Sequence, residues 1–129
     1  MSVTSSDRTE HSAPAGGPRF WFAVLGGIVA WLAHLITLAS LVRYTCNVRG
    51  HTQWVEHVVT AAAAVITLGA LGLCLRYVRA TGTADEEGAG TPWGRTRFLA
   101  TFGVLSNSVN LLLILAEGTY VFVIRPACG

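Results

Sequence analysis

The stretch FLATFGVLSNSVNLLLILAEGTYVFVI, residues 98–124, is apolar over most of its length and carries polar side chains in its middle. A transmembrane helix needs about 20 predominantly apolar residues, and this stretch has 27. Polar groups in a hydrocarbon-facing helix are costly, so they usually mark an interhelical contact or a functional site. The stretch therefore predicts a membrane-spanning helix with a polar seam formed by Ser106, Asn107, Asn110 and Glu117.

Two further apolar stretches, residues 20–42 and 54–75, come before it. Charged residues make up only 12% of the chain and the mean hydropathy is +0.51, whereas ordinary soluble domains have about 25% charged residues. We therefore expect an all-α integral membrane protein with three transmembrane helices. Residues 19–129 would form this transmembrane domain, and residues 1–18, rich in Ser, Thr, Gly and Pro, would form a disordered cytoplasmic tail.

Arginine predicts the orientation, because the chain has no lysine. The side of the amino terminus carries six arginines, namely Arg8, Arg19, Arg76, Arg79, Arg95 and Arg97. The opposite side carries three, Arg43, Arg49 and Arg125. The positive-inside rule then places the amino terminus in the cytoplasm and the carboxy terminus outside.

Each predicted span has one row of residues at heptad-like spacing, which places the row on one helix face. The rows are Gly27, Trp31, His34 and Leu38 or Leu41; His57, Thr60, Ala64, Thr67 and Leu71; and Gly103, Asn107, Asn110, Ile114 and Glu117. Small and hydrogen-bonding side chains on facing stripes are how membrane helices associate. We therefore expect an interhelical polar cluster that contains His34, His57, Asn107, Asn110 and Glu117.

His34, His57 and Glu117 all fall in the outer half of the predicted membrane region. A hydrogen bond between Glu117 and His34 is the simplest way to satisfy both side chains. A metal or proton site is the alternative, although the three residues have no diagnostic ligand spacing. A haem held by both histidines is disfavoured, because their depths differ by roughly 8 Å on straight helices.

The three cysteines divide into one inner and two outer residues. Cys74 sits at the cytoplasmic end of the second span and is expected to be a small buried hydrophobe. Cys46 and Cys128 follow the first and third spans and so share the outer face, where a disulfide can form. A pair of free thiols that bind copper is the competing interpretation, since thiolates favour Cu(I).

The sequence has no phosphate-binding loop, no His-Glu-X-X-His, no Gly-X-Ser-X-Gly and no aromatic-basic surface for nucleic acid. We therefore expect no enzymatic activity, no cofactor and no nucleic-acid partner. The expected partners are the lipid bilayer and other membrane subunits.

Several short runs resemble a family of small bacterial membrane proteins that are often encoded beside haem-copper cytochrome c oxidase and its copper-delivery factor. The resemblance rests on residues 31–34 (WLAH), Cys46, residues 97–100 (RFLA), Gly103, Asn107, Leu115, Glu117, Gly118 and residues 126–128 (PAC). It implies a respiratory-chain setting in the bacterial plasma (inner) membrane. The matched positions that it singles out are Trp31, His34, Asn107, Glu117 and Cys128.

Three functions are compatible with these features. The first is an accessory or assembly subunit of a larger membrane complex, such as a respiratory terminal oxidase. The second is a homo-oligomeric channel or transporter with a polar path lined by Glu117 and Asn110. The third is a purely structural membrane protein. The number of copies per complex distinguishes the first from the second.

Overall fold

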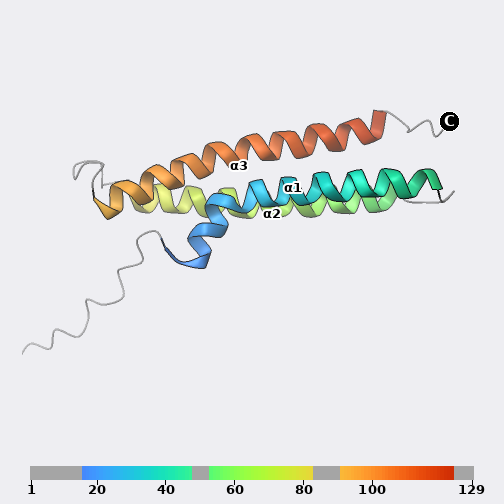
Figure 1. Ribbon diagram of the computed structural model, residues 1–129. Coiled ribbons are helices and arrows are strands. Elements are labelled where there is room, and N and C mark those ends of the chain that lie inside the picture. Colours follow the sequence, from blue (N-terminus) through green and yellow to red (C-terminus); the bar gives the residue numbers. More distant parts are fainter. Residues whose placement is uncertain (1–15, 48–52, 83–90, 124–129) are drawn as a thin grey trace, which may run out of the picture.

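The described residues, 16–47, 53–82 and 91–123, form a bundle of three long helices that run up, down and up (Figure 1). In this computed structural model, α1 spans Pro18–Asn47, α2 spans Gln53–Ala80 and α3 spans Pro92–Val123. Each helix packs against both of the others. All three are long and apolar enough to cross a membrane, which confirms the predicted class of an all-helical chain with three candidate spans. The cytoplasmic position of the amino terminus stays a prediction.

Helices α2 and α3 both extend beyond the apolar stretches 54–75 and 98–124, so only residues 81–91 connect them. Helix α2 continues to Ala80 and ends in a turn in which the Gly82 N–H donates to the Arg79 carbonyl oxygen at 3.3 Å. Helix α3 begins at Pro92, and the Thr91 hydroxyl accepts the Gly94 N–H at 3.2 Å. Proline suits the first helical position and threonine caps it. These helix ends are set by capping, whereas the predicted ends followed hydropathy alone.

Small residues let the three helices approach closely. A Cβ added at Gly103 of α3 would lie 2.6 Å from the Cys74 sulfur and 3.2 Å from the Val24 Cα. A Cβ added at Gly118 would lie 2.7 Å from the Thr60 methyl carbon. These glycines therefore set the spacing of α3 from both other helices.

The buried face of α2 differs from the predicted row. Its buried residues are Glu56, Ala63, Thr67, Ala70 and Cys74. Thr67 belongs to the predicted row. Ala64 and Leu71 also belong to it but are only half-buried, and the residues just before them, Ala63 and Ala70, are buried instead. The reason is close contact with α1, where a Cβ at Gly26 would lie 3.0 Å from the Ala70 Cβ. The predicted row was therefore wrong by one position at these two residues.

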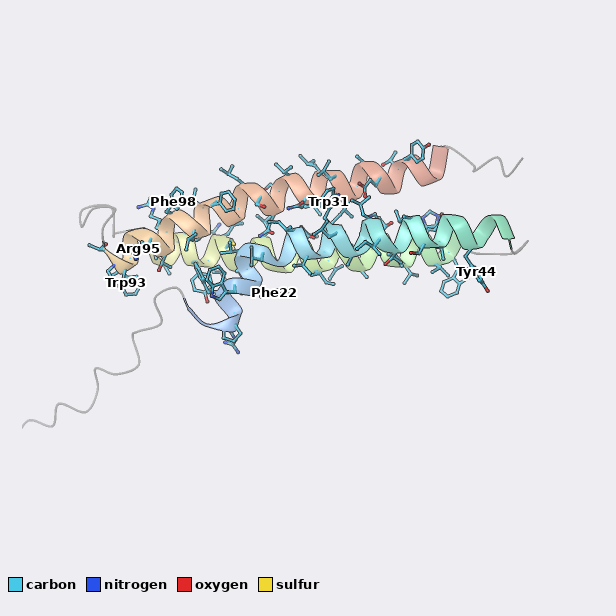
Figure 2. All side chains as sticks on the ribbon, in the orientation of Figure 1. Phe22, Trp31, Tyr44, Trp93, Arg95 and Phe98 are labelled. Atoms are coloured by element: carbon cyan, nitrogen blue, oxygen red, sulfur yellow. The ribbon has the colours of Figure 1, made fainter. Side chains whose placement is uncertain are left out.

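The outside of the bundle is apolar over most of the length of the helices. Exposed side chains include Ile36 at 66%, Val65 at 68% and Phe98 at 71%. Figure 2 shows Phe98 on the outward side of α3 and Trp31 between α1 and α3. An apolar exterior around a polar seam is the arrangement expected of helices that face lipid.

Candidate functional site

His34 lies at the centre of a hydrogen-bonded network that reaches all three helices. Its Nδ1 atom is 3.1 Å from Glu117 Oε2 of α3, and the Trp31 indole N–H donates to Glu117 Oε1 at 3.2 Å. Its Nε2 atom is 3.0 Å from the Thr60 hydroxyl oxygen of α2. The Thr60 hydroxyl donates to the Glu56 carbonyl oxygen at 2.9 Å. Because His34 is only 1% exposed, these contacts hold a polar ring inside the bundle.

The contacts of His34 are compatible with two arrangements of hydrogen atoms. When the hydroxyl donates to the Glu56 carbonyl, its oxygen accepts an N–H from His34 Nε2. One further proton then lies between Nδ1 and Glu117, on either the ring or the carboxyl group. When the hydroxyl donates to Nε2 instead, a neutral His34 ring donates from Nδ1 to a Glu117 carboxylate. The two arrangements differ by one proton and keep the same contacts between heavy atoms.

Asn107 of α3 bonds to both partners of one helical hydrogen bond in α1. In a regular α-helix the Gly27 N–H donates to the Ala23 carbonyl oxygen, four residues earlier. Here the Gly27 N–H donates to Asn107 Oδ1 at 2.9 Å, and Asn107 Nδ2 donates to the Ala23 carbonyl oxygen at 2.7 Å. The Cys74 thiol of α2 donates to the same carbonyl oxygen at 3.0 Å. Backbone groups inside a membrane need such partners, because lipid offers none.

The axis of α1 bends near this contact, and Figure 1 shows its first turns directed away from the line of the remaining helix. A side chain that enters the ladder of helical hydrogen bonds is one known cause of a kink.

The partners also fix the orientation of the Asn107 amide, since a reversed amide would place oxygen against oxygen at Ala23. A Cβ at Gly27 would collide with Asn107 Oδ1. Glycine is therefore required where α3 touches the backbone of α1.

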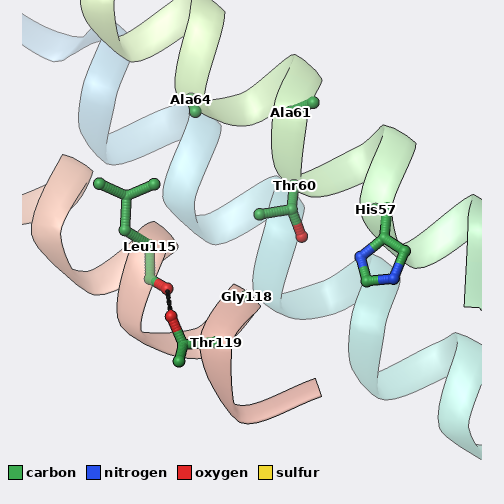
Figure 3. Close-up of a pocket in the computed structure, with 7 residues that line it drawn as sticks. All are labelled: His57, Thr60, Ala61, Ala64, Leu115, Gly118 and Thr119. Carbon is green, nitrogen blue, oxygen red and sulfur yellow. Dashed lines mark hydrogen bonds between the residues drawn. The ribbon is translucent and has the colours of Figure 1, made fainter. Parts of the chain in front are cut away.

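Asn110 and His57, two other residues of the predicted cluster, have different surroundings. Asn110 is 7% exposed, and its amide donates to the Ser106 carbonyl oxygen of its own helix at 2.8 Å. His57 lines a groove of about 300 Å³ between α2 and α3, together with Thr60 and Gly118 (Figure 3). The structure thus brings His34 and Glu117 into contact and places Asn107 in a second cluster. Asn110 bonds within α3, and His57 faces the groove.

The cysteines predicted to form a disulfide fall largely outside the described residues. Nothing is described of Cys128, and only the helical backbone is described for Cys46. That backbone places Cys46 in the last turn of α1 rather than after the helix, because α1 continues to Asn47. Cys74 is a buried free thiol. Within residues 16–47, 53–82 and 91–123, no three His, Cys, Asp or Glu side chains gather in a way that could hold a metal ion.

The sequence placed Gly27 on the packing face, but it did not indicate that the Gly27 N–H and the Ala23 carbonyl oxygen are the partners of Asn107. Backbone N–H and carbonyl groups occur at nearly every residue, so their use as partners leaves no mark in residue types. The adjacent glycines Gly26 and Gly27 are the available signal, since small residues in a membrane helix allow another helix to come close.

Comparisons of the chain with protein-family models, with curated proteins and with solved structures find no match.

Proposed function

We propose that this chain is an accessory or assembly subunit of a larger membrane complex. One observation carries the proposal: the polar side chains of the candidate site bond to partners within a single copy of the chain. Glu117 meets Trp31 and His34, and Asn107 meets the α1 backbone. In the most apolar 18-residue segment of each span only 22–33% of the residues are buried, so a large and mostly apolar surface remains for lipid and for partner helices.

The complex that we propose is a respiratory terminal oxidase of the bacterial inner membrane, with the amino terminus of this chain in the cytoplasm. The support for this is the resemblance of the WLAH and RFLA runs, residues 31–34 and 97–100. Trp31, His34, Asn107 and Glu117, which that resemblance matches, all take part in the two buried clusters. In this role they would hold the three helices in the shape that a partner recognises, without catalysing a reaction.

A homo-oligomeric channel would need polar side chains directed at a shared axis. Glu117 instead faces Trp31 and His34 of its own chain, and its side chain is 29% exposed. Asn110 is buried and bonds to Ser106. These contacts favour the accessory role over a polar path lined by Glu117 and Asn110.

The outward face of α2 is where we expect a partner helix to dock. Gly69 and Gly72 are exposed there, and a Cβ added at either would meet nothing within 4 Å. Large apolar side chains flank them, with Leu68 52% exposed. Glycines free of internal packing allow another helix to approach closely, which is how membrane helices associate.

Affinity purification of the full chain in mild detergent tests the proposal, with identification of co-purifying subunits and a haem absorbance spectrum. We expect haem-containing subunits in the preparation of the unaltered chain. Gly69→Leu should remove them while the chain itself remains folded, because the added side chain blocks the docking face. Ala116→Leu, the same kind of change at an exposed site of α3, should retain them. Recovery of the chain alone would contradict the accessory role.

A further inference from the structure

A second apolar groove, of about 320 Å³, lies between the first half of α1 and α2. Its lining includes Trp21, Phe22, Gly26, Val29 and Ala33 of α1 and Ile66 of α2. Along α1 the lining runs from residue 21 to residue 33, or about 18 Å at 1.5 Å per residue. That length is close to the depth of one hydrocarbon leaflet, about 15 Å. The groove therefore has the length and the apolar character of a site for a lipid acyl chain.

The pairing of α1 with α2 shows which charged residues lie at the mouth of this groove. The Phe20 ring packs edge-on against the Tyr77 ring with centroids 5.3 Å apart, and Gly26 lies opposite Ala70. These antiparallel pairs place Arg76 level with the beginning of the groove. Arg76 is exposed at that point.

Arg19 lies at the same end of the groove. It precedes Phe22 by three residues and Gly26 by seven, which is the spacing of one helix face, and it is exposed. The acidic residues in the described part of the chain are Glu56, in the first turn of α2, and Glu117, near the end of α3. Both belong to the opposite end of the bundle. The mouth of the groove is therefore basic, with no described carboxylate near it.

We propose that this groove binds an anionic phospholipid, with one acyl chain along the groove and the phosphate at Arg19 and Arg76. The guanidinium fork matches phosphate oxygens in geometry as well as in charge. Arginines at the membrane surface attract anionic lipid, and Trp21, at the same level, suits the headgroup region. Free phosphate would use the arginines alone, whereas a phospholipid also fills the apolar groove below them.

Native mass spectrometry of the full chain in mild detergent tests this binding. The probes are dioleoyl phosphatidylglycerol, dioleoyl phosphatidylcholine with the same acyl chains, and inorganic phosphate. Phosphatidylglycerol should be retained in preference to phosphatidylcholine, and it should raise the unfolding temperature more than phosphate does at the same concentration. The double variant Arg19→Gln/Arg76→Gln should bind phosphatidylglycerol about thirtyfold more weakly. Arg95→Gln, an exposed arginine of α3, serves as the matched control and should change the affinity less than twofold.

A second pair of variants tests the groove without changing charge. Ala33→Leu fills the groove and should weaken phosphatidylglycerol binding, whereas Ala39→Leu, at an exposed site of α1 outside the groove, should not. Val29→Phe, at a lining position that is 62% exposed, gives the same test if Ala33→Leu fails to fold.

Three outcomes would overturn the proposal. Equal binding of the two phospholipids would remove the headgroup recognition, and equal stabilisation by inorganic phosphate would leave a free-anion site only. Loss of a co-purifying subunit from Ala33→Leu with unchanged lipid content would make the groove a protein-docking face instead.

Discussion

At Asn107, one carboxamide of α3 bonds to a backbone donor and to a backbone acceptor of α1. Its two polar atoms bond to the Gly27 N–H and to the Ala23 carbonyl oxygen. Asn107 is completely buried, and its neighbours on the outside of the bundle are apolar, so water has no access to these bonds. The shape of the first turns of α1 therefore depends on a residue 80 positions away in the sequence.

Replacing Asn107 with leucine should expose that dependence. Asn107→Leu removes the side-chain acceptor of the Gly27 N–H and one of the donors to Ala23, so we expect a loss of about 1–3 kcal/mol in the free energy of unfolding. Asn110→Leu is the matched control, because among the described residues the Asn110 amide bonds to Ser106 of its own helix. Reversible unfolding in mixed detergent micelles measures both. Equal losses from the two variants would contradict the special role of Asn107.

Glycine-to-alanine changes provide a second test at the scale of single residues. Gly27→Ala forces a methyl group against Asn107 Oδ1, and we expect it to destabilise the bundle by about 1–3 kcal/mol. Gly69→Ala adds the same methyl group where nothing lies within 4 Å. It should therefore stabilise α2 by up to about 1 kcal/mol through backbone entropy. Reversible unfolding in mixed detergent micelles measures both changes. Destabilisation of similar size by both would argue against the packing described at Gly27.

At the scale of helices, Glu117 joins α3 to α1 through Trp31 and His34. Glu117→Gln can accept from the Trp31 N–H and bond to the His34 ring, so we expect the fold and partner binding to survive. Glu117→Leu removes the partner of the Trp31 N–H and of His34 Nδ1 and should lower the free energy of unfolding by about 1–3 kcal/mol. Unfolding in detergent and co-purification are the readouts. If Glu117→Gln instead abolishes the activity of the complex at normal protein level, the proton held by this network, rather than packing, is what the complex uses.

The sequence predicts the helices better than the contacts between them. Apolar length alone predicts three spans, and the polar row of α3 contains the buried Asn107 and Ile114. The sequence cannot predict which face of α2 is buried, because Ala63 and Ala64 are chemically identical. Only the approach of α1 distinguishes the two residues. The contact of Asn107 with backbone atoms of α1 is hidden for a similar reason. Both depend on the tertiary register, which residue types leave undetermined.

At the scale of the whole molecule, the up-down-up arrangement places the α2–α3 connection and the end of α3 at opposite ends of the bundle (Figure 1). With six arginines on one side and three on the other, we expect the α2–α3 side to be cytoplasmic. A reporter that is active only outside the membrane should therefore work after Gly129 and fail when fused at Gly88. The reversed pattern, or activity at both sites, would remove the basis for pairing Cys46 with Cys128 on an oxidising face.

The number of copies in the native complex tests the accessory role most directly. Native mass spectrometry of the complex purified in mild detergent should give one copy of this 13.7 kDa chain for each set of partner subunits, because its polar side chains already bond within a single copy. A symmetric assembly made only of this chain, with Glu117 accessible at its axis, would contradict the account.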